Sequence, residues 1–185
     1  MLNLRYNLVM DKKIDIISIA DDVASLSVRS ILEFWGIKVN IHYVAKSQDL
    51  VDIFKKDSLS QNLLLMCHGV EEGIHLPELD PAVVKTQPYD KILTSDNLGE
   101  FLKLNGQIAV STGCKTGTKA FADTFLSKGA KEYIAPGSYP EGTASLFFTV
   151  NFYYFLLVKK LPIKEAYTKS KLIDNETEMF ELFRR

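Results

Sequence analysis

Short apolar runs alternate with amphipathic segments along most of this chain, and both patterns predict regular elements. Continuous or alternating runs of Ile, Val and Leu predict strands. These runs lie at residues 14–20, 37–45, 62–67, 107–111 and 131–136. Segments whose apolar residues recur three or four positions apart predict helices. These segments lie at residues 22–35, 47–54, 96–104, 116–127, 141–158 and 163–175. In the first helix the recurring apolar positions are Val23, Leu26 and Phe34.

The alternation of strands and helices predicts the fold class. Right-handed strand–helix–strand units give an α/β three-layer sandwich, with a mostly parallel central sheet and helices on both faces. The 185 residues suffice for one domain over residues 1–185. We expect its core at about 14–175, an N-terminal arm at 1–13 and a charged C-terminal tail at 176–185.

Composition narrows the classes of partner and compartment. The formal net charge of −1 provides no field that favours nucleic acid or an anionic membrane surface. Two cysteines, Cys67 and Cys114, do not make a disulfide framework, so a reducing compartment is expected. Residues 1–13 lack the apolar core of a signal peptide, and the apolar run at 146–158 is shorter than the roughly 20 residues that span a bilayer. The sequence therefore predicts a cytoplasmic protein with no nucleic-acid or membrane partner.

Two predicted strands end in residues that carry chemistry. His68 and Gly69 follow the strand at 62–67, and Gly113 and Cys114 follow the strand at 107–111. The carboxyl ends of parallel strands share one edge of a sheet, which is where ligands bind in α/β folds. We also expect a helix N-terminus just after Cys114, which favours thiolate over thiol. A thiol beside an imidazole, with backbone N–H donors nearby, is the arrangement needed for nucleophilic catalysis.

Other interpretations of these residues fit less well. A lone cysteine or histidine is more often a core or loop residue than a catalytic one, and Cys67 is expected to be such a core residue. The segment from Gly113 to Lys119 departs from the spacing of a phosphate-binding loop, and no arginine follows Cys114 at the spacing of a phosphatase loop. No metal-binding spacing of Cys and His is present, so no metal and no cofactor are expected.

The two strand-end motifs resemble those of the caspase-like cysteine peptidases, a group that includes caspases, gingipains and separase. The residues concerned are Leu-Leu-Leu-Met-Cys-His-Gly ending at Gly69 and Ile-Ala-Val-Ser-Thr-Gly-Cys-Lys-Thr-Gly ending at Gly117. Within the group they look most like the bacterial CHAT domain. The resemblance implies that His68 is the acid–base residue and Cys114 the nucleophile of a Cys-His dyad that cleaves peptides through a thioester. It also implies oxyanion donors in the backbone at Gly69 and at Gly113–Cys114.

Several functional details stay open at this stage. Thr112 stands where caspases have a glutamine that lines the specificity pocket. The other candidate pocket residues are acidic: Glu71, Asp96 and Glu141. The alternative to a peptidase is a catalytically inactive interaction or regulatory module with the same fold, and a flavodoxin-like binder of small ligands is a third hypothesis. The aromatic helix at 146–158 has too wide an apolar stripe for one buried side, so it is a candidate homodimer surface.

Overall fold

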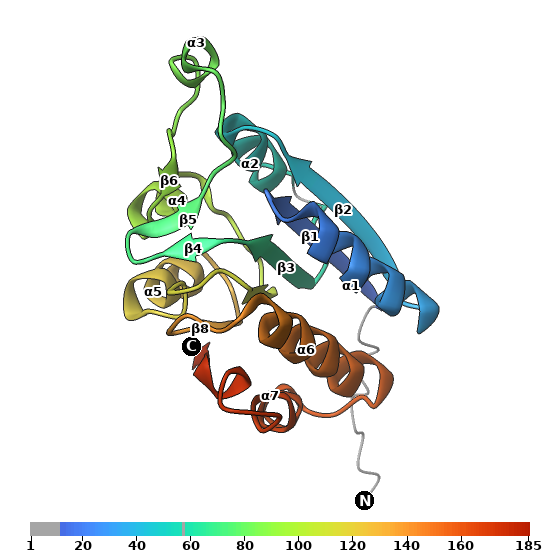
Figure 1. Cartoon of the computed structure of the whole chain (residues 1–185). Coiled ribbons are helices and arrows are strands. Elements are labelled where there is room, and N and C mark those ends of the chain that lie inside the picture. Colours follow the sequence, from blue (N-terminus) through green and yellow to red (C-terminus); the bar gives the residue numbers. More distant parts are fainter. Residues whose placement is uncertain (1–11, 57) are drawn as a thin grey trace, which may run out of the picture.

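The computed structural model describes residues 12–56 and 58–185, and it confirms the predicted three-layer α/β architecture (Figure 1). The central sheet has the strand order β2-β1-β3-β7-β8-β9. These strands are β1 (Lys13–Ile19), β2 (Lys38–Val44), β3 (Asn62–Cys67), β7 (Ile108–Ser111), β8 (Glu132–Pro136) and β9 (Phe180–Arg184). All neighbouring strands are parallel except β9, which runs antiparallel to β8. The predicted arm at 1–13 lies outside the described residues except for its last two, of which Lys13 opens β1.

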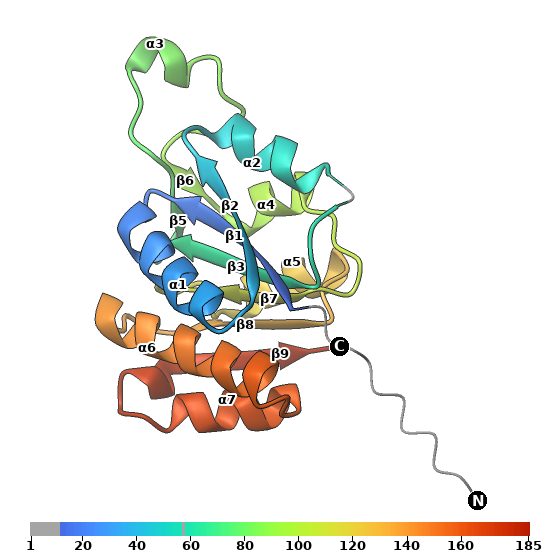
Figure 2. The ribbon, with the colours of Figure 1, turned by 90° about the vertical axis from the view of Figure 1, so that its right-hand side faces the viewer.

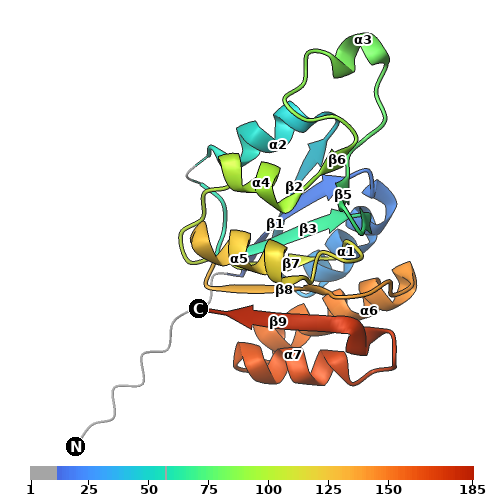
Figure 3. The same ribbon diagram turned by 90° about the vertical axis from the view of Figure 1, so that its left-hand side faces the viewer.

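Helices cover both faces of the sheet, as Figures 2 and 3 show. On one face lie α1 (Asp22–Phe34), α6 (Gly142–Tyr153) and α7 (Ile163–Lys171). On the other face lie α2 (Ser47–Phe54), α4 (Ser95–Phe101) and α5 (Lys119–Ser127). The strand pattern explains this division, because successive side chains point to opposite faces. In β3, Leu63 and Leu65 enter one hydrophobic cluster, whereas Leu64 and Met66 enter the other.

A small second sheet and a protruding segment interrupt this pattern after β3. The second sheet has the order β4-β5-β6 and consists of β4 (Gly69–Val70), β5 (Gly73–His75) and β6 (Ile92–Leu93). Between β5 and β6 the chain leaves the body of the molecule and forms the short helix α3 (Pro81–Val84), which stands out beside α2 in Figure 1. The hairpin of β4 and β5 begins directly after His68. It therefore lies at the edge of the central sheet where the candidate site is expected.

The C-terminal region differs most from the sequence prediction. Residues 176–185 were predicted as a charged tail, and they form the 3₁₀ turn η2 (Thr177–Met179) and then the strand β9. Phe180 is buried and its ring stacks on Phe148 of α6 with centroids 3.8 Å apart. The ordered core therefore extends past the predicted limit at residue 175. The strand contains apolar Phe180, Leu182 and Phe183, but charged residues stand between and after them. Because the segment looked charged in composition, the sequence prediction missed the strand.

Most of the aromatic side chains of the helix at 146–158 pack against other parts of the same chain. α6 ends at Tyr153 and continues as the π-helical turn η1 (Tyr154–Val158). Phe148, Phe152 and Tyr153 are buried, whereas Phe147 keeps 52% of its surface exposed. A homodimer through this helix stays a prediction. Among the described residues, no helix is long and apolar enough to cross a membrane.

A buried carboxylate fastens the end of the sheet opposite the candidate site. Asp15 accepts hydrogen bonds from Asn40 at 3.0 Å, from the backbone N–H of Ser60 at 2.6 Å and from Nε2 of His42 at 2.8 Å. Burial acts to raise the pKa of Asp15, but these hydrogen bonds outweigh it and hold the pKa well below its usual range. A group whose pKa is depressed in the folded protein stabilises the fold above its unfolded pKa, and that stability is lost as the pH falls.

Replacing Asp15 tests this link between pH and stability. Asp15→Asn is expected to lower the free energy of unfolding by about 2 kcal/mol at pH 7, because charge-assisted hydrogen bonds to a buried carboxylate are lost. The difference from the wild type should shrink as the pH falls below about 4, where the unfolded carboxyl group is protonated. Urea unfolding at a series of pH values measures it, with the exposed Asp52→Asn as control. An equal loss of stability at pH 3 and pH 7 would contradict the assignment.

Candidate active site

The two motifs predicted to meet do so through a close backbone contact. β3 and β7 are neighbours in the sheet, so the residues that follow them leave the same edge side by side. A Cβ atom added to Gly69 would lie 2.0 Å from the carbonyl oxygen of Cys114 and 2.9 Å from its nitrogen. Only a residue without a side chain permits this approach. The structure therefore brings the His68–Gly69 segment against the Gly113–Cys114 segment.

A buried polar network fixes the loop that carries Cys114. The hydroxyl of Thr116 donates to the carbonyl of Gly113 at 2.6 Å and lies 3.0 Å from the hydroxyl of Ser111. The Ser111 hydroxyl accepts the N–H of Gly113 at 3.2 Å. The hydroxyl of Tyr133, from β8, donates to the carbonyl of Thr116 at 3.0 Å. These hydrogen bonds hold the turn after β7 in one shape without using Cys114.

The same loop is attached to the segment that follows β8. Gly117 donates its N–H to the carbonyl of Pro136 at 2.8 Å, and a Cβ on Gly117 would meet the carbonyl oxygen of Ala135 at 2.3 Å. Lys115 donates its N–H to the carbonyl of Ser138 at 3.0 Å and has a φ of +60°. A left-handed conformation is costly for a lysine, so the surrounding contacts must enforce it. Residues 113–117 and 136–140 thus form one unit around Cys114.

The thiol of Cys114 is half-buried and held as a neutral group. Its Sγ donates to the carbonyl oxygen of Pro140 at 3.8 Å. Burial raises the pKa of Cys114, although its own backbone N–H acts in the opposite direction. This is a correction of the sequence prediction, which placed a helix start at residue 116 and expected the thiolate to be favoured. Helix α5 begins only at Lys119, five residues after Cys114, so the thiol does not lie in the first turn, where the helix dipole acts.

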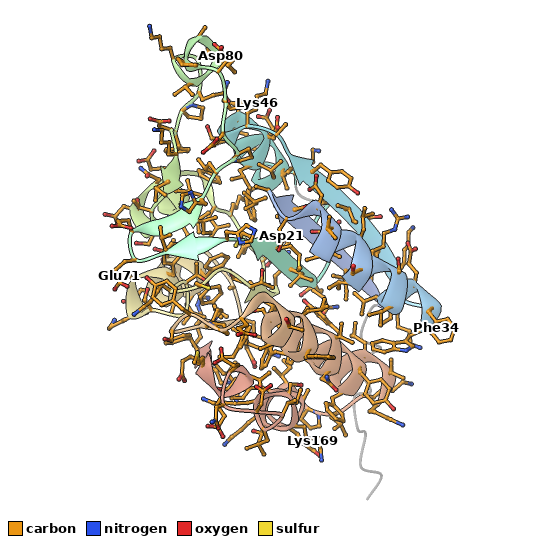
Figure 4. The ribbon with its side chains drawn as sticks, viewed as in Figure 1. Asp21, Phe34, Lys46, Glu71, Asp80 and Lys169 are labelled. Atoms are coloured by element: carbon orange, nitrogen blue, oxygen red, sulfur yellow. The ribbon has the colours of Figure 1, made fainter. Side chains whose placement is uncertain are left out.

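An acidic residue outside the predicted site, Asp21, lies at this edge of the sheet. Asp21 follows β1, the neighbour of β3, and precedes α1. Figure 4 places Asp21 near the centre of the molecule, where β3 leads into β4. Burial raises the pKa of Asp21, and the electrostatic effect of His68 acts in the opposite direction. The carboxyl group of Asp21 and the imidazole of His68 therefore interact electrostatically.

The turn that delivers Asp21 is strained. Ala20 has a φ of +55°, an uncommon conformation for a residue with a side chain. The Asp21 side chain makes no capping hydrogen bond to α1. Instead, the hydroxyl of Ser18 donates to Asp22 at 2.7 Å and accepts from Ser25. The carboxylate of Asp21 is thus not used as a helix cap, and its signal in the sequence is only its place after a buried strand.

The backbone N–H groups of Gly69 and Gly113 differ in whether they already donate a hydrogen bond within the chain. The N–H of His75 donates to the carbonyl of His68 at 2.9 Å, so Gly69 and Ile74 form a non-hydrogen-bonded pair. The N–H of Gly69 is therefore not used by β5. The N–H of Gly113 is occupied by Ser111, which removes Gly113 as a free oxyanion donor.

The four predicted pocket residues occupy different positions. Glu71, at the tip of the β4–β5 hairpin in Figure 4, lies 3.3 Å from Nζ of Lys115 and accepts from the hydroxyl of Tyr139 at 3.2 Å. Thr112 is buried, and its hydroxyl bonds to the backbone of Leu65 and Cys67, so it fastens β7 to β3 and does not line an open pocket.

The remaining two acidic residues are exposed. Asp96 lies in the first turn of α4, and no contact in the described part of the chain joins it to His68 or Cys114. Glu141 precedes α6, and its backbone N–H donates to the carboxylate of Glu176 at 3.0 Å. That N–H belongs to the same peptide group as the Pro140 carbonyl that faces Cys114.

Cys67 behaves as the core residue that was expected. It is buried at the end of β3, its Sγ lies 3.6 Å from the Ser111 hydroxyl, and burial raises its pKa to about 12. Within residues 12–56 and 58–185, no group of three or more His, Cys, Asp or Glu side chains is arranged to hold a metal ion.

Comparison with solved structures identifies the fold. The Arg-specific cysteine proteinase gingipain R matches with a TM-score of 0.62 at 12% identity, over 94% of this chain and 46% of that chain. A complex of the pro- and mature domains of Porphyromonas gingivalis RgpB matches with a TM-score of 0.61 at 12% identity, over 95% of this chain and 47% of that chain. The separase of the Saccharomyces cerevisiae separase–securin complex matches with a TM-score of 0.61 at 11% identity, over 95% of this chain and 12% of that chain.

These structures share the caspase-like fold, and this chain has the same fold. The chain spans about half the length of the gingipain chains and about an eighth of the separase chain. No protein-family model matches the sequence, and no curated protein matches it.

The Gly69 contact can be tested by adding one methyl group. Gly69→Ala is expected to lower the free energy of unfolding by about 1–3 kcal/mol, because the new Cβ collides with the Cys114 backbone. Gly142→Ala is the matched control, since a Cβ there meets no atom within 4 Å. Denaturant unfolding of both variants gives the comparison. Equal stabilities of Gly69→Ala and Gly142→Ala would show that the two segments are not in contact.

The interaction between Asp21 and His68 predicts a change in the pKa of Asp21 that can be measured whether or not the protein is an active enzyme. His68→Gln removes the positive charge that opposes the effect of burial, so the pKa of Asp21 should rise further above its ordinary value. Carbon-13 NMR titration of the aspartate carboxyl groups measures this pKa. His75→Gln, on the exposed side of β5, should leave the pKa of Asp21 unchanged. The same Asp21 titration in the wild type and in His68→Gln would rule out the interaction.

Proposed function

We propose that this chain is a cysteine endopeptidase of the caspase-like type, with Cys114 as nucleophile and His68 as acid–base residue. The observation that carries the proposal is the backbone contact of Gly69 with Cys114, which joins the imidazole-bearing and thiol-bearing strand ends. The caspase-like fold supports it, because cysteine peptidases are among the proteins that share this fold. The order of strand–His–Gly and strand–Cys–x–x–Gly also supports our assignment to the CHAT branch of the group.

The chemistry follows from a neutral thiol and an adjacent imidazole. His68 takes the proton from Cys114 as Sγ attacks the carbonyl carbon of the substrate peptide. The carbonyl oxygen becomes an oxyanion, for which the N–H groups of Gly69 and Cys114 are the proposed donors. When the C–N bond breaks, His68 gives its proton to the departing amine and a thioester remains on Cys114. Water then attacks the thioester, with His68 accepting its proton and returning one to the sulfur.

Asp21 completes this scheme as a positioning residue. A carboxylate close to the imidazole favours the protonated form that exists after the thiol proton has been taken. Because burial raises the pKa of Cys114, the thiol begins the reaction in its neutral form and His68 has to accept its proton. The substrate is a peptide or protein, and Glu71 is the proposed pocket residue, since it contacts Lys115 and Tyr139 beside the nucleophile.

The second candidate function is an inactive interaction or regulatory module with the same fold. Two observations favour it: the pKa of Cys114 is raised, and no hydrogen bond among the described residues joins His68 to Cys114. Hydrogen bonds in unliganded catalytic sites are often long and tighten when substrate binds, so these observations do not decide between the two functions.

Covalent labelling separates the two functions. A mixture of peptidyl acyloxymethyl ketones that varies at the residue beside the ketone should alkylate Cys114, with the adduct located by mass spectrometry. Cys114→Ala should abolish the adduct and lower peptide hydrolysis by about 10⁴-fold or more. Cys67→Ala removes the other thiol and should retain both activities, since Cys67 lies in the core.

Two outcomes of this labelling experiment would contradict the proposal. Labelling that persists in Cys114→Ala would disprove the nucleophile assignment. A folded wild-type protein that is neither labelled nor able to cleave any member of a peptide library would instead support the inactive module.

A further inference from the structure

A cavity of about 570 Å³ lies outside the Cys114 site, under the segment that protrudes between β5 and β6. Its lining includes the apolar side chains of Leu76, Leu79, Val84 and Tyr89. Its volume falls within the range of about 300–1,000 Å³ that is usual for ligand pockets. The function proposed above does not use this cavity.

The walls of the cavity are tied to the body of the molecule. The hydroxyl of Ser47, the first residue of α2, donates to the carbonyl of Tyr89 at 2.8 Å and accepts its N–H at 3.3 Å. The hydroxyl of Tyr89 donates to Glu100 of α4 at 2.8 Å. The N–H of Leu76 donates to the carbonyl of Lys91 at 2.9 Å, which closes the base of the protruding segment. These hydrogen bonds attach the segment that lines most of the cavity to α2, to α4 and to its own base.

One backbone hydrogen bond links the lining of the cavity to the candidate active site. His75 lines it, and the backbone N–H of His75 donates to the carbonyl of His68 at 2.9 Å. Ser47 also lines it and follows β2, which is the third strand from β7 in the order β2-β1-β3-β7. Strands are spaced by about 4.8 Å, so β2 lies about 10 Å from β3 and about 14 Å from β7 across the sheet. An extended peptide covers this span in three to four residues at about 3.3 Å each.

The charge around the cavity is mixed. Glu78 and Asp90 provide negative charge, whereas Lys85 and Lys91 provide positive charge. Opposite charges in equal number give the rim no overall preference for an acidic or a basic side chain. Selection must then come from the apolar interior.

We infer that this cavity is a remote substrate subsite, which accepts an apolar side chain three or four residues from the scissile bond on the side that runs toward β2. The inference rests on the proposed function, because it assigns the cavity to the same peptide that Cys114 attacks. The segment opposite, residues 136–140, would then hold the other side of the substrate.

The test begins with the cleavage preferences of the full chain. Wild-type protein is incubated with a peptide library prepared by digesting a proteome, and cleavage sites are identified by mass spectrometry. Leu, Val and Phe should be enriched at the third or fourth residue on one side of the cut and not on the other. From these sites, a long substrate is synthesised together with a short one that ends before the remote residue.

Two neighbouring valines of α3 provide the variant and its control. Val84 lines the cavity, whereas Val83 does not line it and is 41% exposed. Val84→Glu should lower the ratio of kcat/KM for the long over the short substrate by about tenfold, as expected when an apolar contact is lost in a specificity pocket. Val83→Glu should leave the ratio unchanged. Val84→Thr, a smaller change in the same direction, is measured as well in case Val84→Glu fails to fold.

The outcomes separate this inference from the function on which it rests. Cleavage at Cys114 without any remote preference, or with a ratio that Val84→Glu and Val84→Thr do not alter, overturns the subsite and leaves the peptidase proposal intact. The absence of any cleavage by the wild type overturns both.

Discussion

The contact between the backbones of Gly69 and Cys114 is the constraint on which the site depends. The pairing of β3 with β7 brings the two strand ends together, but the distance of 2.0 Å from a hypothetical Cβ to the Cys114 carbonyl shows that a glycine is required. Below this contact, Ser111 and Thr116 satisfy the polar groups of the turn, so Cys114 is free to face the edge of the sheet. Any ligand at this edge would meet a preformed loop.

The C-terminal segment is part of the same frame. β9 pairs with β8, and the carbonyl of Met179 accepts the N–H of Gly137 at 2.9 Å. Glu176 accepts the N–H of Glu141, whose peptide group carries the Pro140 carbonyl that contacts the thiol. The position of the thiol's partner is therefore set by residues more than thirty positions away in the sequence. The sheet edge is organised from both ends of the chain, because Asp21 comes from the first described strand.

Much of the fold was predictable because its signals are local. A run such as 62–67 is apolar at almost every position, and only a strand buried on both faces uses such a run in a short element. The structure confirms β3 at these bounds. The amphipathic helices were located to within a few residues at their ends. Which of their faces would be buried was not always predicted correctly. In α1 the buried residues are Ser25, Val28 and Leu32, whereas Val23 and Phe34 are 81% and 87% exposed. Helical spacing identifies the helix, but the neighbouring layers decide which face is covered.

The sequence by itself determined the alternating strands and helices, the three layers and the sheet edge at which His68 and Cys114 emerge. Tertiary structure decided the rest: that residues 180–184 complete the sheet, that the charges of Asp21 and His68 interact, and that Cys114 is a neutral, half-buried thiol. The physical reason is the distance along the sequence between the residues that determine each feature. Strand and helix patterns depend on a few adjacent residues, whereas burial, charge pairing and edge-strand addition depend on segments that are distant in the chain and become neighbours only on folding.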